Sequence, residues 1–247
     1  MITATQTMTI AGMPYIRVIA EAADPAEIEK LKQHFSYIHL YSYQPLALSG
    51  FSSQKQTISL IDLSSDEAAI FRRFKKNTRN EIRKTEGRPE MSFRVPDPDR
   101  NHAYDFYRQI KRRDGVSPDL RQEFADCLFF NAYLDQKLIV SMSCYQATPI
   151  LRLKHLVSVR KQKNSNPRIA GYASRRLVWE ICKYAKSHGY RWFDLAGVNL
   201  TDPKKSGVAQ FKQSFGGELR TNYIYRYERS IFLLARKIIK FLGYNIH

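Results

Sequence analysis

Three stretches decide the fold: RIAGYA (168–173), YRWFDLAGV (190–198) and FKQSFGGE (211–218). The spacing of apolar residues around them predicts helix 172–188, buried strand 190–197, helix 207–215 and strand 219–228. The first stretch predicts a loop that opens a helix, where backbone amides and the helix dipole can hold an anion. This order points to a transferase that binds a phosphate-bearing acyl donor.

The preceding part of the chain predicts further strands and helices. Residues 129–160 contain three strand-like stretches separated by an Asp-Gln turn and a Thr-Pro turn, which is typical of a three-stranded antiparallel meander. Other strands are expected at 14–20, 56–63 and 91–95, and helices at 24–35, 65–87, 101–115, 117–129 and 229–247. A meander followed by a strand, a crossover helix and a parallel strand gives an α+β (mixed α/β) fold, with a mixed, largely antiparallel central sheet flanked by helices.

Composition describes a folded and strongly basic protein. Of the 247 residues, 43% are hydrophobic, and the formal net charge is +17. This excludes a disordered chain and favours a polyanionic partner, such as RNA, an anionic membrane surface or a nucleotide-linked substrate. The alternative is a protein that is merely basic.

Targeting patterns and cysteine usage predict a cytoplasmic location. The three cysteines form no metal-binding or disulfide pattern, so we expect buried thiols and no metal site. The sequence has no signal-peptide pattern and no apolar run long enough to span a membrane.

Two basic groups are candidates for binding the donor's phosphates. Arg168, Gly171 and Ala173 belong to the expected loop, where the glycine would let the backbone approach a pyrophosphate. Lys161 and Lys163 precede this loop. The second group lies on helix 65–87 and comprises Arg79, Arg83 and Lys84. The alternatives are an ordinary strand–helix turn for the first group and a solvated helix face for the second.

Candidate catalytic side chains follow the meander. Asp194 lies on a buried strand, either bonded to a neighbouring loop or orienting an incoming amine. Lys212, beside Phe211, would stabilise a developing oxyanion or a phosphate unless it is a surface lysine. His155 lies in a central strand, as a general base or as a core histidine.

Two apolar patterns near the C-terminus allow two interpretations each. Tyr223 and Tyr225 share one face of the last strand, where they either line a substrate pocket or pack in the core. The final helix has an apolar stripe that fits either the core or an anionic membrane surface, and we expect it to dock on the core. The stripe comprises Ile231, Leu234, Ala235, Ile238 and Leu242.

These segments resemble the Fem family of aminoacyltransferases, which are variants of the GNAT acyltransferase fold. The resemblance covers roughly residues 56–228 and rests on the basic helix, on Asp-x-x-Gly (194–197) and above all on Phe-Lys-x-x-Phe-Gly-Gly (211–217). It implies a GNAT-like catalytic domain over 66–228, preceded by an abbreviated GNAT-like portion (1–65) and followed by an amphipathic helix (229–247). It also implies a catalytic role for Lys212.

The resemblance implies an N-acyltransferase with no permanently bound cofactor. Aminoacyl-tRNA would be the co-substrate, and the acceptor would be an amine on a cell-envelope precursor of the peptidoglycan type or a related small molecule. The RIAGYA stretch resembles the acyl-CoA loop of ordinary GNAT enzymes, so an acyl-CoA-dependent enzyme acting on an amino sugar or peptide amine stays open. A further alternative is a non-catalytic protein that binds RNA or a membrane surface. Both enzyme alternatives are compatible with a cytoplasmic location and with peripheral contact with the inner face of an anionic membrane.

Overall fold

The computed structural model describes residues 3–162 and 165–246. Its strands are β1 (Thr3–Ile10), β2 (Met13–Ala20), β3 (Tyr37–Ser42), β4 (Ser52–Asp62), β5 (Met91–Arg94), β6 (Cys127–Leu134), β7 (Lys137–Ala147), β8 (Ile150–Ser158), β9 (Trp192–Gly197) and β10 (Glu218–Glu228). Its α-helices are α1 (Pro25–Leu31), α2 (Glu67–Arg73), α3 (Lys76–Arg83), α4 (Arg100–Arg113), α5 (Pro167–Ser187), α6 (Ser206–Gln213) and α7 (Ser230–Phe241).

The strands form a ten-stranded sheet in the order β1-β2-β3-β10-β4-β9-β8-β7-β6-β5. Two neighbouring pairs, β2–β3 and β8–β9, are parallel, and the other pairs are antiparallel. The expected meander is β6–β7–β8. The expected α+β class, with a mixed and largely antiparallel sheet, is therefore confirmed.

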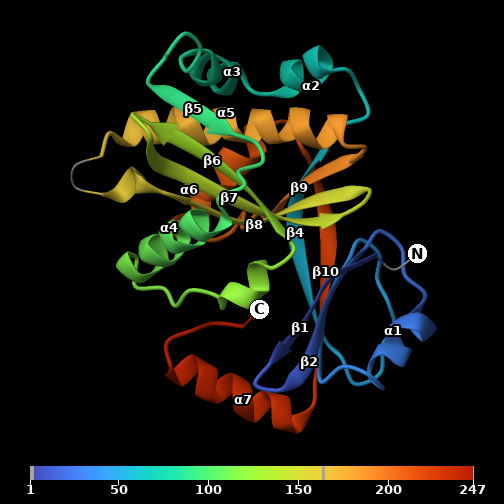
Figure 1. Ribbon diagram of the computed structural model, residues 1–247. Coiled ribbons are helices and arrows are strands. Elements are labelled where there is room, and N and C mark those ends of the chain that lie inside the picture. Colours follow the sequence, from blue (N-terminus) through green and yellow to red (C-terminus); the bar gives the residue numbers. More distant parts are fainter. Residues whose placement is uncertain (1–2, 163–164, 247) are drawn as a thin grey trace.

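Helices cover both faces of this sheet, as Figure 1 shows. On one face α5 buries Leu177 and Ile181 against the strands, and α2 and α3 pack against α5, with Ile70 and Ile82 in the same apolar cluster. On the other face α4 packs through an aromatic cluster that includes Tyr107. Because both faces are covered, β7 and β9 are buried along most of their length.

β10 joins the N-terminal strands to the rest of the sheet. It pairs with β3 along Tyr223–Glu228 and with β4 along Glu218–Arg226. Backbone hydrogen bonds therefore run without interruption from β2 to β9. The division of the chain at residues 65 and 228 into an abbreviated portion, a catalytic domain and a final helix stays a prediction.

β8 and β9 pair only briefly before they separate. Their parallel ladder covers Ile150–Arg152 and Trp192–Asp194. Ala196, just beyond it, has a positive φ of 60°, which an L-residue adopts at a cost of about 1–3 kcal/mol. β8 has a β-bulge at Lys154, where its pairing register with β7 shifts by one residue. The bulge lies close to the point where β8 and β9 separate. The backbone is therefore distorted on both strands where they diverge.

The long helix expected over 65–87 is wrong in one respect: the structure divides it into α2 and α3. Phe74 and Lys75 are extended between them, with ψ angles of 143° and 147°. Phe74 is buried against Trp179 and Phe215, and the Lys75 amide donates to the carbonyl of Ser214. These tertiary contacts outweigh the local preference for a continuous helix.

The helix expected over 117–129 is also wrong. The structure has only a 3-10 turn, Arg121–Phe124, and Cys127 already begins β6. Asp119 instead forms a parallel bridge with Asn245, whose amide donates to the carbonyl of Pro118. The sequence reasoning did not predict β1 and β3, which complete the N-terminal edge of the sheet.

The apolar stripe of the final helix does not dock on the core as expected. Phe232, which is not part of that stripe, is the buried residue of α7 and stacks on Tyr37 with ring centroids 4.8 Å apart. Ile231, Leu234, Ile238 and Leu242 face outward. The three cysteines are buried and free, as expected. Within the described residues, no helix is both long and apolar enough to cross a membrane.

Candidate active site

A polar cavity of about 240 Å³ lies where β8 and β9 separate. Its walls come from both halves of the sheet, because β3, β4 and β10 face β7, β8 and β9 across it. The lining residues are His39, Tyr41, Gln56, Asp119, Tyr145, Arg152, Leu153, Lys154, His155, Ala196, Gly197, Ile224 and Arg226. This is the usual position of a ligand in a sheet with diverging parallel strands.

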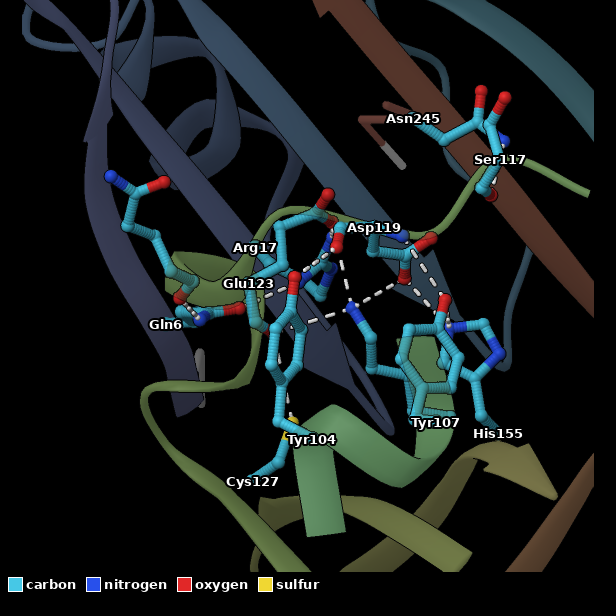
Figure 2. A network of polar contacts seen from close by, with 12 residues as sticks. Gln6, Arg17, Tyr104, Tyr107, Ser117, Asp119, Glu123, Cys127, His155 and Asn245 are labelled. Atoms are coloured by element: carbon cyan, nitrogen blue, oxygen red, sulfur yellow. Dashed lines mark hydrogen bonds and ion pairs between the residues drawn. The ribbon is translucent and has the colours of Figure 1, made fainter. Parts of the chain in front are cut away.

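Asp119 holds the two consecutive side chains at the β8 bulge. Its Oδ2 lies 2.7 Å from Nε2 of His155 and 2.9 Å from Nζ of Lys154. The Tyr107 hydroxyl lies 3.3 Å from the same His155 nitrogen and accepts a hydrogen bond from the Asp119 amide. Figure 2 shows Asp119 in contact with both His155 and Tyr107. The bulge matters because it lets neighbouring residues of one strand reach a single carboxylate.

The network continues into the N-terminal strands. Lys154 Nζ lies 3.6 Å from the Glu123 carboxylate, which pairs with Arg17 of β2 at 2.7 Å. Arg17 also donates to Gln6 of β1 at 2.6 Å (Figure 2). Arg17 and Glu123 have fully buried side chains. Charges buried this deeply need partners, so the N-terminal hairpin and the cavity wall form one electrostatic unit.

His155 is neutral near pH 7. Burial is the main cause that lowers its pKa to about 4; Asp119 opposes the shift, while Lys154 and Lys111 add to it. Because an ionised carboxylate only accepts hydrogen bonds, Nε2 must carry the proton of the neutral ring. The lone pair therefore lies on Nδ1. Burial alone would lower the pKa of Lys154, but Asp119 and Glu123 together raise it, so this lysine stays charged.

Asp194 is fully buried and lies at the end of the β8–β9 ladder, beyond which the strands separate. It forms a close ion pair with Arg152 of β8 and accepts a hydrogen bond of 2.6 Å from the Tyr43 hydroxyl. Its Oδ1 accepts another from the amide of Ala196, the residue with positive φ. These bonds explain how a carboxylate is tolerated on β9, and they hold Arg152 at the cavity wall.

Lys212 reaches the same place from α6. Its Nζ donates to the carbonyl of Gly197, which lines the cavity, at 2.7 Å. Burial lowers the pKa of Lys212 to about 8, Asp194 opposes this shift and Arg152 adds to it. An ammonium has three N–H donors, so two others are available to a substrate once Gly197 has accepted one. The neighbouring Phe211 packs edge-on against Phe215, with ring centroids 5.1 Å apart.

The glycines after Phe215 allow the motif to touch the rest of the protein. A Cβ on Gly216 would lie 2.3 Å from the carbonyl oxygen of Arg73, and Gly216 has a φ of +65°. A Cβ on Gly217 would lie 2.7 Å from Oγ of Ser59. Side chains at these positions would push α6 away from β4 and from the junction of α2 and α3. The Phe-Gly-Gly sequence thereby sets the position of Lys212.

The loop expected at 168–173 is wrong, because these residues lie inside α5. Phosphate binding by Arg168, Gly171 and Ala173 stays a prediction. The helix begins at Pro167, and the side chain of its N-cap, Asn166, accepts from the amides of Arg168 and Ile169. Gly171 is buried in helical conformation, and Ala173 belongs to the core. Arg168 is exposed on the first turn. Lys163 lies outside the described residues.

The three basic candidates on and just after α3 make structural contacts. Arg79 donates to the carbonyls of Arg72 and Phe74 and so fastens the junction between α2 and α3. Arg83 lies over the ring of Phe71, and Lys84 lies 5.2 Å from the ring of Tyr172 on α5. None of the three lines the cavity between β8 and β9.

Tyr223 and Tyr225 face away from this cavity, contrary to the pocket interpretation. They pack with the α1 side of the sheet, where the Tyr225 hydroxyl accepts from the amide of Leu46 at 2.7 Å. Because successive strand residues alternate in direction, Ile224 and Arg226 reach the cavity instead.

Of the predicted residues, His155 lines the cavity, and Asp194 and Lys212 contact its lining residues Arg152 and Gly197. The structure adds four that the sequence reasoning missed: Asp119, Lys154, Arg152 and Tyr43. A pattern that could have indicated two of them is the presence of Arg152 and Lys154 in an otherwise apolar central strand. Asp119 and Tyr43 lie in connecting segments and carry no comparable pattern.

A model of the FemAB family matches residues 170–223, which contain most of α5, β9, α6 and the first half of β10. No curated protein matches the sequence. Among solved structures, FemX is similar with a TM-score of 0.60 and 11% identity, over 92% of this chain and 85% of that chain. L-PGS from Bacillus licheniformis has a TM-score of 0.56 and 13% identity, over 96% of this chain and 89% of that chain.

These comparisons confirm a Fem-type fold. The solved structures extend over nearly the whole chain, whereas the family match covers the segment that contains Lys212, Asp194 and the Phe-Gly-Gly turn. The family match indicates that the protein is an acyltransferase enzyme.

Proposed function

We propose that the protein transfers an aminoacyl group from aminoacyl-tRNA to an amine of a cell-envelope precursor of the peptidoglycan type. The observation that carries this proposal is the cavity between the separating ends of β8 and β9, with His155 in its wall and Lys212 bonded to Gly197 at its edge. A base and a cation at one cavity are the groups that acyl transfer to an amine requires.

Two features support tRNA as the donor over acyl-CoA. The amides at the start of α5, which would hold a CoA pyrophosphate, already donate to Asn166. The net charge of +17 suits a polyanion that makes many phosphate contacts.

In the proposed reaction, the acceptor nitrogen attacks the carbonyl carbon of the aminoacyl ester. The C–N bond forms as the carbonyl oxygen gains negative charge, which the Lys212 ammonium stabilises. Nδ1 of His155 takes the proton released by the attacking nitrogen. The C–O bond to the terminal ribose then breaks, and the ribose oxygen receives that proton from His155.

Asp194 acts in this scheme as a positioning residue. Its bonds to Arg152, Tyr43 and Ala196 fix the end of the β8–β9 ladder and hold the backbone next to Gly197, whose carbonyl Lys212 reaches. Asp119 is likewise a positioning residue, because its carboxylate orients the His155 ring and keeps the proton on Nε2. Holding two bound substrates in place would supply a large part of the rate acceleration.

The test is a transfer assay with radiolabelled aminoacyl-tRNA and a panel of amine acceptors, including a peptidoglycan precursor peptide. We expect label to appear in an acceptor, and digestion of the tRNA by ribonuclease before the reaction should abolish transfer. Lys212→Met should remove transfer while the protein stays folded, as circular dichroism would show. Transfer from acetyl-CoA, together with micromolar binding of CoA by calorimetry, would replace the tRNA proposal. Salt-sensitive binding of RNA without transfer to any acceptor would overturn catalysis altogether.

A further inference from the structure

The α7 helix exposes large apolar side chains on one side. The exposed fractions are 64% for Ile231, 60% for Leu234, 55% for Ile238, 89% for Phe241 and 66% for Leu242. Their spacing of three, four and seven residues places most of them along a single side of the helix. Scattered exposed residues would need no explanation, but a contiguous apolar face of this size marks an interaction surface.

This surface is held in place by the other side of the helix. Phe232 is fully buried and stacks on Tyr37, and Ile239 packs in the same cluster with Ile10 and Tyr15. Arg236 pairs with Glu228 of β10 at 3.1 Å. The exposed apolar side is therefore what remains after α7 has docked, and Figure 1 shows the helix at the margin of the molecule.

A cationic cavity lies beside the helix. It has a volume of about 350 Å³ and is lined by Arg226, Arg236, Lys237 and Lys240, together with Tyr37 and residues 244–246. Glu228 offsets the charge of Arg236. Arg226, Lys237 and Lys240 therefore give the cavity a net positive charge, next to the exposed apolar side of α7.

We propose that α7 docks on an anionic lipid surface, with its exposed apolar side among the acyl chains and lipid phosphates at the cationic cavity. An apolar side flanked by lysine and arginine is the arrangement that binds in the plane of a membrane interface. RNA would use the cations but not the five apolar side chains. A second copy of this chain would bring the same cations against them, and like charges repel.

Docking by α7 would bring the candidate active site close to the lipid surface. Arg226 of β10 lines both the cationic cavity and the cavity between β8 and β9. The two cavities are thus neighbours on the same strand. The docking proposal does not depend on the transfer reaction, since it is tested by binding alone.

The experiment is flotation of the purified protein with vesicles of phosphatidylcholine containing 30% phosphatidylglycerol, and with phosphatidylcholine alone. We expect flotation with the anionic vesicles, at least about tenfold stronger than with the neutral ones, and weaker at high salt because the surface charges are screened. Inorganic phosphate at millimolar concentration should not displace the protein, because it cannot replace the acyl chains.

Two double variants separate the two parts of the surface. Leu234→Glu with Ile238→Glu should weaken binding at least about tenfold, whereas Leu219→Glu, an exposed apolar position on β10, should leave it unchanged. Lys237→Glu with Lys240→Glu should also weaken binding about tenfold or more, against the charge-matched control Lys30→Glu with Lys137→Glu. All of these positions are exposed, so circular dichroism should show an unchanged fold.

Three results would overturn the proposal. One is no flotation with anionic vesicles. Another is equal binding by the α7 variants and their controls. The third is a dimer in lipid-free analytical ultracentrifugation that Leu234→Glu with Ile238→Glu dissociates, because the apolar side would then belong to an interface between copies.

Discussion

Nε2 of His155 lies 2.7 Å from Oδ2 of Asp119, although 36 positions separate the two residues in the chain. The contact joins a central strand to a connecting segment that the C-terminal residues also touch, through the bridge between Asp119 and Asn245. It gives a neutral imidazole a fixed proton and leaves its second nitrogen as an acceptor.

The first prediction concerns this pair. His155→Ala should lower kcat by about 10²–10⁴, the usual effect of losing a general base. Asp119→Asn should lower kcat less and add little in the His155→Ala background, because Asp119 acts through the histidine. Steady-state kinetics of the two single variants and the double variant measure this. Equal losses from Asp119→Asn with and without His155 would show that the aspartate acts independently.

The second prediction concerns pH. The pKa of Lys212 is lowered to about 8, so its positive charge is present below that pH and is lost as the pH rises through it. If the ammonium stabilises the oxyanion, kcat should fall on the alkaline side of about pH 8. The residual kcat of Lys212→Arg should not fall above about pH 8, since arginine stays charged there. An unchanged alkaline limb in the arginine variant would assign the ionisation to another group.

The third prediction concerns stability at Lys212. A buried ammonium whose pKa lies below its ordinary value destabilises the fold while it is charged. Lys212→Met should therefore raise the melting temperature at pH 7 by a few degrees, on the order expected for a chain of this size, while activity is lost. Between about pH 8 and 10.5 the wild type loses this charge, so the difference between the two proteins should shrink. Differential scanning calorimetry at several pH values checks both trends.

The fourth prediction concerns Gly216. Gly216→Ala should destabilise the fold by about 1–3 kcal/mol or more, because its Cβ meets the Arg73 carbonyl and its φ is positive. Gly189 also has a positive φ, but an added Cβ would meet no atom within 4 Å, so Gly189→Ala measures the cost of the backbone conformation without a steric clash. Gly207→Ala has neither and should be neutral or slightly stabilising. Urea denaturation ranks the three, and equal effects at Gly216 and Gly189 would remove the steric argument.

The fifth prediction concerns the buried pair of Arg17 and Glu123. Arg17→Met should destabilise the protein by about 3–5 kcal/mol, because it leaves a buried carboxylate with fewer partners. The exposed pair of Arg220 and Glu218 is the matched control, and Arg220→Met should change stability by no more than about 1 kcal/mol. A small effect at Arg17 would mean that the N-terminal hairpin is not coupled to the cavity wall.

Local pattern was sufficient for several parts of the fold. The meander of β6, β7 and β8 follows from strand-like stretches separated by turn sequences, and α4 and α5 follow from apolar spacing. The Phe-Lys-x-x-Phe-Gly-Gly stretch indicated the family and the region around Lys212. These features are set by residues that lie close together in the sequence, so the sequence alone is enough to predict them.

Local pattern failed where distant contacts dominate. Helix propensity runs through Phe74, yet burial against Trp179 and Phe215 breaks the helix there. The start of α5 looked like an open anion-binding loop, but the Asn166 side chain extends the helix to Pro167 and uses the free amides. In both cases one tertiary or capping interaction outweighs a weak local preference.

The sequence by itself determined the α+β class, the buried strand that carries Asp194 and the lysine motif beside it. Only the tertiary structure decided that Asp119 faces His155, that Arg152 neutralises Asp194 and that α7 turns its apolar stripe outward. The reason is physical. Periodicity shows which side of a strand or helix is apolar, but the partner of a buried charge is set by which strands lie next to one another in the sheet.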